Sequence, residues 1–352
     1  MPEQTVHPGL SVTLRTLLLG ACGALIGYWV SLPLFLLTGP AILISSLSLT
    51  RMRFAIHPLI WNAALLVIGL RIGAGITNEA TAAFLRWPLA FVALAGLLGA
   101  IMFTSRWTLE RVFGFSRIGA TLAATPGHLS MVLGLGAELK SDLARISVVQ
   151  AVRILALTLL VPFAAGLSGL DLGIGVGAAQ GVMPVRELLW LAGFGLVLGL
   201  TMRRLRIPAP MLIGGMIVST SAHVGGLSTG ALSPWIAMPG FIVVGTMIGT
   251  RFSGISVAQL RRDGLAGILI TAIAGSLALV ASWPVAAILG VPLLHVLVAF
   301  APGGLETMVV IGAVLGANPG FIAACHVARL FMLLFLLPLM LGRNSVRPHS
   351  PP

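Results

Sequence analysis

Of the ionisable side chains that lie inside apolar segments, three are the main candidates for binding a charged solute or carrying a proton. Arg153 and Arg329 occupy matching places in the two halves of the chain, each near the middle of an apolar run. Arginine can donate two parallel hydrogen bonds to a carboxylate or phosphate, so two such residues favour an anion. Glu306 is the only acidic residue within an apolar run. Carboxyl groups inside membrane segments often carry protons, which makes Glu306 a candidate for proton coupling.

Other polar residues surround these three in the sequence. Gln150 and His326 precede the two arginines by three residues, which places each pair on one helix face. Two residues of the first half, His128 and Ser130, take the places of Gly304 and Glu306 in the second. We therefore expect a site for a small anionic or amphoteric solute. The substrate-binding candidates are Arg153, Arg329, His128, Ser130 and Thr307, and the proton-coupling candidates are Glu306 and His326.

Each candidate also has a purely structural interpretation. The arginines could bond the exposed carbonyl groups of a neighbouring broken helix, and Glu306 could form a buried ion pair with Arg329. His128 could be a hydrogen-bonded packing residue. Arg71 lies one turn from a helix end, so its side chain is expected to snorkel outward. Asp263 and Arg262 are expected to form a pair at the surface.

The segments that position these residues recur at a constant offset of 176. Rare residue types carry this signal, because leucine, alanine and glycine matches mean little in an apolar chain. The recurring pairs are Pro58/Pro234, Pro126/Pro302, Pro162/Pro338, Trp107/Trp283, Arg86/Arg262 and Arg153/Arg329. The chain therefore divides into two membrane repeats, residues 1–176 and 177–352. Internal repeats in a membrane chain are typical of transporters and channels.

The amino-acid composition is that of an integral membrane protein. Of its 352 residues, 58% are hydrophobic and 9% charged, with a mean hydropathy of +1.06. This is more apolar than a soluble core requires, and it predicts an all-α polytopic membrane protein. The apolar segments are 12–28, 34–49, 57–76, 87–104, 118–137 and 144–165 in the first half. In the second half they are 188–202, 209–221, 234–250, 264–282, 292–315 and 320–341.

The fifth segment of each half contains a predicted helix break. Pro126-Gly127 and Pro302-Gly303 fall inside these segments, where proline removes a backbone donor and glycine weakens the helix. A break within lipid has to be shielded by protein or by a water-filled cavity. The second segments are also predicted to be short and interrupted, at Thr38-Gly39-Pro40 and at Gly214-Gly215.

The distribution of basic residues predicts how the halves are inserted. If each fifth segment enters and leaves on the same side, 16 of the 18 Lys and Arg residues outside the membrane segments fall in cytoplasmic loops. If all twelve segments cross instead, the same 18 Lys and Arg residues divide equally between the two sides of the membrane. The preferred arrangement has five crossings and one re-entrant segment per half. Because five is odd, the second half is inverted, both termini are cytoplasmic, and the protein is expected in the bacterial inner membrane.

Two features of the repeat resemble the AbrB-type family of bacterial membrane proteins. Gly69-x-x-x-Gly73 returns as Gly245-x-x-x-Gly249, and such small-residue segments suit close helix packing. Each is followed by a break, Pro-Gly-His-Leu from Pro126 and Pro-Gly-Gly-Leu from Pro302. The resemblance covers essentially the whole chain. It implies a distant similarity in fold to inverted-repeat cation/proton antiporters, and members are labelled as ammonia monooxygenase or as a regulator of gene expression.

The residues favour neither enzyme chemistry nor nucleic-acid binding. The seven histidines show no ligand spacing for copper or iron, and no nucleophile–base pair is visible, so we expect no catalytic residues, metal or cofactor. The net charge of +12 reflects arginine-rich loops, because no soluble segment is long enough for a nucleic-acid-binding module. Cys22 and Cys325 are expected to fill apolar cores.

We therefore expect a secondary transporter whose partners are a small-molecule solute and the lipid bilayer. A homo-oligomer is compatible with these features. The alternative is a membrane sensor that binds a ligand without transporting it and affects gene expression indirectly.

Overall fold

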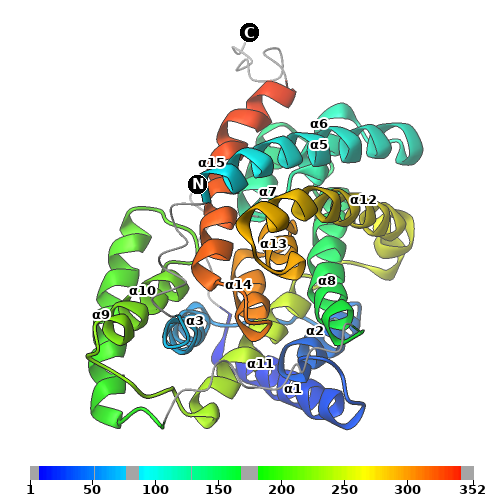
Figure 1. Cartoon of the computed structure of the whole chain (residues 1–352). Helices are drawn as coiled ribbons and strands as arrows, with labels where there is room; N and C mark the ends of the chain where they lie inside the picture. Colours follow the sequence, from blue (N-terminus) through cyan, green and yellow to red (C-terminus); the bar gives the residue numbers. More distant parts are fainter. Residues whose placement is uncertain (1–7, 51, 77–86, 128, 168–180, 342–352) are drawn as a thin grey trace. The chain divides into compact units, whose positions relative to one another are not determined.

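A computed structural model describes residues 8–50, 52–76, 87–127, 129–167 and 181–341. The regular elements in these ranges are α-helices (Figure 1). They are α1 (Leu10–Trp29), α2 (Phe35–Ser48), α3 (Pro58–Gly73), α5 (Trp87–Phe113), α6 (Arg117–Ala124), α7 (Leu129–Glu138), α8 (Leu143–Leu167), α9 (Val185–Arg204), α10 (Pro210–Val224), α11 (Pro234–Thr250), α12 (Val257–Leu289), α13 (Leu293–Phe300), α14 (Leu305–Val314) and α15 (Pro319–Leu341).

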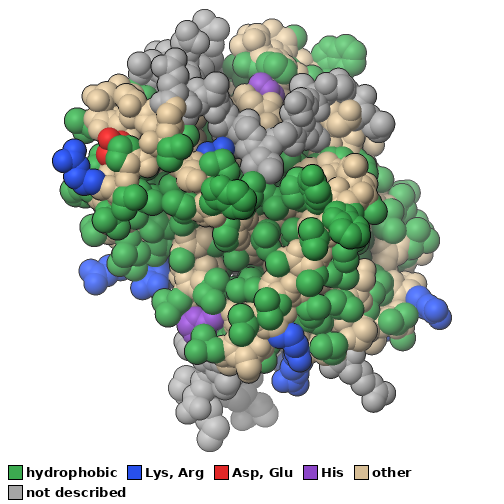
Figure 2. Space-filling model, turned by 90° about the horizontal axis from the view of Figure 1, so that it is seen from below, with side chains coloured by type: hydrophobic (Ala, Val, Ile, Leu, Met, Phe, Trp, Pro, Cys, Tyr) green, Lys and Arg blue, Asp and Glu red, His purple; other side chains and the backbone are tan. Residues whose placement is uncertain are grey.

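Six of the helices in the described ranges are long and apolar enough to cross a bilayer, namely α1, α5, α8, α9, α12 and α15. Five shorter apolar helices accompany them. Hydrophobic side chains cover much of the face shown in Figure 2, and large ones such as Leu10, Trp235 and Phe335 are more than 70% exposed. A helix that exposes this much apolar surface suits lipid rather than water. The predicted all-α polytopic membrane protein is thus confirmed.

Helix boundaries repeat at the offset found in the sequence. The offset of 176 carries α6 (Arg117–Ala124) onto α13 (Leu293–Phe300), and α7 (Leu129–Glu138) onto α14 (Leu305–Val314). The same offset carries the start of α3 onto the start of α11. These coincidences concern boundaries along the chain, and the inverted insertion of the second half stays a prediction.

The chain forms two compact units, each of which contains segments from both halves. Unit 1 comprises Met1–Leu85, Thr158–Gly254 and Leu305–Ala323. Unit 2 comprises Arg86–Leu157, Ile255–Gly304 and Ala324–Pro352. The predicted repeats at 1–176 and 177–352 divide the sequence differently and stay a prediction.

Glycines allow the helices of unit 1 to pack backbone to backbone. A Cβ atom added to Gly69 of α3 would lie 2.3 Å from the carbonyl oxygen of Leu212 in α10. At the equivalent position of α11, a Cβ atom on Gly245 would lie 2.3 Å from the carbonyl oxygen of Leu37 in α2. The two Gly-x-x-x-Gly motifs are therefore contacts within the chain, as their packing interpretation requires.

Two sequence predictions about unit 1 are wrong. Helices α2 and α10 are short but uninterrupted, because Gly39 and Gly214 make close contacts with the backbones of Gly23 and Gly199 instead of breaking their helices. Arg71 does not snorkel. Its side chain is buried, and Nη1 donates to the backbone oxygen of Leu232 at 2.6 Å.

Unit 2 has an apolar core with an ionic cluster beside it. The core joins α5, α6, α8, α12 and α15 through side chains such as Met102 and Leu333. Asp263 of α12 pairs with Arg145 of α8 and with its neighbour Arg262, each through Nε at 2.8 Å. The predicted Asp263–Arg262 pair exists, but its surface location is wrong because the Asp263 side chain is only 1% exposed. The long-range partner Arg145 shields it from solvent.

Candidate functional site

The two predicted helix breaks have the same local geometry in both halves. Helix α6 ends at Ala124, and its cap Thr125 turns to an extended conformation with ψ 116°. Helix α13 ends at Phe300, and its cap Ala301 is also extended, with ψ 132°. Pro126 and Gly127 follow the first cap, and Pro302 and Gly303 follow the second. Each short helix therefore ends with backbone carbonyl groups that lack helical partners.

Side chains of α8 bond the carbonyl groups at the first break. The Gln150 amide nitrogen donates to the backbone oxygens of Leu122, Ala123 and Thr125 at 3.1, 3.2 and 3.0 Å. Both terminal nitrogens of Arg153 approach the Thr125 oxygen at 3.3 Å, and Nη2 also donates to Oε1 of Gln150 at 2.5 Å. Gln150 and Arg153 thus act together as a cap for α6.

An arginine at the equivalent position of α15 bonds the second break. Arg329 donates from Nη1 to the backbone oxygen of Ala301 at 3.0 Å and from Nη2 to that of Gly303 at 3.1 Å. Ala301 stands in the second half where Thr125 stands in the first, so the two arginines bond equivalent carbonyl groups. His326, in the place of Gln150, is fully buried. Each arginine therefore makes the carbonyl contacts that its structural interpretation predicts.

Carbonyl contacts do not use the whole of either guanidinium group. Arg153 is 3% exposed and Arg329 is 4% exposed, and the Nε atom of each has no hydrogen-bond partner among the described residues. The two positive charges are close enough to repel each other. Within the described part of unit 2, neither forms an ion pair with a carboxylate. Buried charges without a countercharge are costly, so this pair would be stabilised by an anion.

The remaining predicted site residues fall elsewhere or outside the description. Glu306 and Thr307 lie in the first turn of α14, within unit 1, where Glu306 is partly exposed and Thr307 is buried. A carboxylate in the first turn of a helix is favoured by the helix dipole. His128 and the side chain of Ser130 lie outside the described residues. The Glu306–Arg329 ion pair and the roles of His128, Ser130 and Thr307 stay predictions.

Sequence reasoning missed how Gln150 contributes to the site. Its side chain is fully buried, and its amide bonds three carbonyl groups at the C-terminal end of α6. The available signal was a polar residue in an apolar run, aligned with His326 and one turn before an arginine. A polar residue so placed needs partners, and a broken helix end supplies them.

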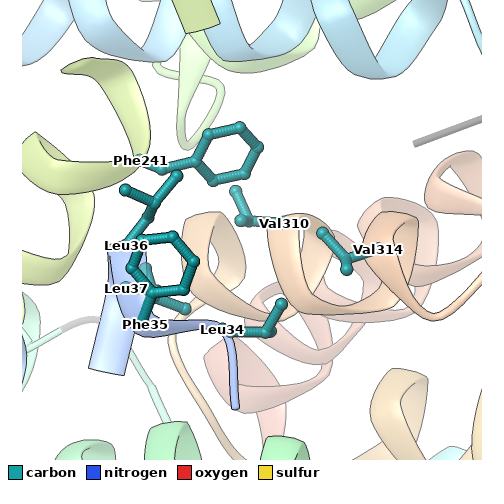
Figure 3. Close-up of a pocket in the computed structure, with 7 residues that line it drawn as sticks. All are labelled: Leu34, Phe35, Leu36, Leu37, Phe241, Val310 and Val314. Atoms are coloured by element: carbon teal, nitrogen blue, oxygen red, sulfur yellow. The ribbon is translucent and has the colours of Figure 1, made fainter. Parts of the chain in front are cut away.

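Unit 1 contains an apolar cavity, shown in Figure 3. It is lined by the start of α2, by Phe241 of α11, and by Val310 and Val314 of α14. Its volume is about 30 Å³, and every side chain that lines it is hydrophobic. A cavity of this size and composition does not suit a polar solute.

Comparison with known proteins matches the chain to one family model and to two bacterial relatives. A family model described as "Transition state regulatory protein AbrB" matches residues 35–343. "Uncharacterized protein YhjN" of Bacillus subtilis is 26% identical over 257 residues, covering 66% of this chain and 65% of that protein. "Putative regulator AbrB" of Escherichia coli is 25% identical over 325 residues, covering 88% of this chain and 89% of that protein. No solved structure matches.

Proposed function

The chain belongs to the AbrB family, and we propose that it acts as a secondary transporter for a small anionic or amphoteric solute. The observation that carries this proposal is the pair of buried arginines, Arg153 and Arg329. Each bonds the end of a broken helix and leaves its Nε atom without a partner among the described residues. Paired cations on irregular backbone suit an anion site inside a membrane protein.

The proposed architecture is an inverted repeat in the bacterial inner membrane. Each half contributes five crossings and one broken re-entrant segment, and both termini are cytoplasmic. The coincidence of helix boundaries at the offset of the sequence repeat supports a duplicated unit. In proteins of this kind, solute sites lie between the repeats near the middle of the bilayer, where broken helices meet.

Glu306 and His326 are proposed to carry the coupled proton. Glu306→Gln should abolish uptake driven by a pH gradient, because an amide cannot release a proton. The fold should be retained, because Glu306 is partly exposed in the first turn of α14. Uptake into proteoliposomes, with and without an imposed gradient, measures this. Full gradient-driven activity in the variant would remove Glu306 from the mechanism.

A thermal-stability screen of purified protein against small carboxylates, amino acids and amines tests the anion site. Ligands stabilise the folded state by mass action, so binding can be detected without a transport assay. Ligand stabilisation should vanish in Arg153→Gln and in Arg329→Gln, each compared with its own ligand-free baseline. Gln150→Leu is the matched control, because it weakens the same break without removing a charge. If the arginine variants respond to ligand as Gln150→Leu does, the arginines are structural only.

A non-transporting membrane sensor is the second candidate, and the regulatory name of the Escherichia coli relative favours it. Such a protein would bind its ligand and act on gene expression through a cytoplasmic partner. It would not catalyse a reaction, and we propose that the transporter does not either. Counterflow of a labelled ligand into preloaded proteoliposomes separates the two candidates, because only a transporter exchanges solute across the bilayer.

A further inference from the structure

Ionisable side chains hold the loop between α10 and α11, residues 225–233, against the rest of unit 1. His223 lies in the last turn of α10. Its Nδ1 atom is 2.7 Å from the backbone oxygen of Ser219, and its Nε2 atom is 2.9 Å from that of Gly230. Ser228 in the loop donates from its hydroxyl to Oε2 of Glu187 at 2.7 Å, and that hydroxyl is 3.5 Å from Nε2.

The two carbonyl oxygens determine which form of the imidazole ring fits this position. A carbonyl oxygen can only accept a hydrogen bond, and a neutral imidazole has one N–H group. The neutral ring therefore bonds either Ser219 or Gly230 and directs a lone pair at the other oxygen. A doubly protonated ring donates to both. Its positive charge is also favoured near the C-terminus of α10, where the helix dipole is negative.

We propose that His223 is a proton-operated latch on loop 225–233. With two protons on the ring, α10 is tied to Gly230 and the loop is held closed. When the ring loses the proton on Nε2, Nδ1 keeps its hydrogen bond to Ser219 within α10, the bond to Gly230 is lost, and the loop loosens. This inference is independent of the transporter proposal. The distribution of basic residues predicts that the loop lies outside the cytoplasm, so the latch would respond to external acidity.

Two other charged groups in the described residues approach the latch from the helices packed against α10. Glu187 comes from α9 and is connected through the Ser228 hydroxyl, so its negative charge favours the doubly protonated ring. Arg71 comes from α3 and donates to the Leu232 oxygen at 2.6 Å. This bond anchors the loop without involving the imidazole ring. Backbone contacts between Ala231 and residues 181 and 183 hold the loop at every pH.

The equivalent loop of the first half, residues 49–57, is held in another way. Its backbone donates to the hydroxyl groups of Thr13 and Thr16 and accepts from Arg15. The histidine at its end, His57, accepts the backbone N–H of Leu59 through Nδ1 at 3.3 Å. The 49–57 loop is therefore an internal comparison for the 225–233 loop within the same protein.

Hydrogen–deuterium exchange of the full chain in nanodiscs, between pH 5.5 and 8 and corrected for intrinsic exchange rates, tests the latch. Protection of residues 225–233 should fall by on the order of tenfold as pH rises, which is the effect of losing one charge-assisted hydrogen bond. Residues 49–57 should show no such fall. In His223→Gln, the pH dependence of the 225–233 loop should disappear.

A second variant, Glu187→Gln, tests the same proposal if the His223→Gln protein does not fold. Glu187→Gln retains the imidazole and removes the charge that favours its protonation, so the loss of protection should begin at a lower pH. Equal pH dependence in both loops would overturn the proposal. So would an unchanged pH dependence of the 225–233 loop in a folded His223→Gln protein, or in Glu187→Gln.

Discussion

Replacing Arg145 with glutamine should destabilise unit 2 far more than the same change at Arg262. Both arginines bond the Asp263 carboxylate through Nε at 2.8 Å, but their surroundings differ. The Arg145 side chain is 20% exposed, whereas that of Arg262 is 54% exposed. Arg145 also lies 3.7 Å above the Phe115 ring and donates to the Phe113 backbone oxygen at 2.9 Å.

The expected cost of Arg145→Gln follows from what is left behind. Removing one partner of a buried ion pair costs about 3–5 kcal/mol, because the remaining charge keeps its desolvation penalty. We expect about 3 kcal/mol, the lower end of that range, since Arg262 still bonds the other carboxylate oxygen. Arg262→Gln should leave stability within error of the parent protein, because exposed pairs contribute little.

Equilibrium unfolding in mixed micelles measures both variants, and Asp263→Asn completes a double-mutant cycle with Arg145→Gln. The double variant should lose less stability than the sum of the two single variants, because neither charge is then left alone. Equal losses from Arg145→Gln and Arg262→Gln would refute the reasoning from burial. Additive losses in the cycle would refute the ion pair as the source of stability.

Two further predictions concern helix packing and the first break. Gly69→Ala should destabilise unit 1 by about 1–3 kcal/mol, because its Cβ would meet the Leu212 oxygen of α10; Gly99→Ala has open space and should be neutral or slightly stabilising in the same unfolding assay. Gln150→Leu should cost about 2 kcal/mol by leaving carbonyl groups of the first break unbonded. A Gln150→Leu protein as stable as the parent would mean that water or Arg153 satisfies those groups.

Much of the secondary structure could be predicted, because helices in lipid must be long, apolar and internally bonded. The segment 57–76 corresponds to α3, and 292–315 corresponds to α13 and α14 with the break between them. Pro126-Gly127 and Gly39-Pro40 look alike in the sequence. In the structure, α2 continues through Pro40 while Gly39 packs closely against the backbone of Gly23, whereas α6 ends before Pro126. The local sequence does not distinguish a glycine that lets two helices pack closely from a glycine that ends a helix.

Site residues that the sequence repeat aligns could be predicted. Contacts between residues that lie far apart in the chain could not. Alignment of Arg153 with Arg329 identified two equivalent positions, and both side chains bond equivalent carbonyl groups. The burial of Asp263 could not be predicted, because its neighbours Arg261 and Arg262 suggest a surface. Its partner Arg145 is 118 residues away in the chain.

The interleaving of the two units has a consequence for how the protein is made. Unit 1 requires Leu305–Ala323, and unit 2 requires the segment that follows, Ala324–Pro352. When synthesis has reached Gly254, both units therefore still lack segments that they need to fold. Until those segments are made, the early helices lack part of their packing partners, so their glycine-lined faces and charged groups are only partly covered. In this state they are accessible to chaperones and proteases. Loss of the last helix should consequently leave both units unfinished, with degradation of the whole chain rather than survival of an N-terminal domain.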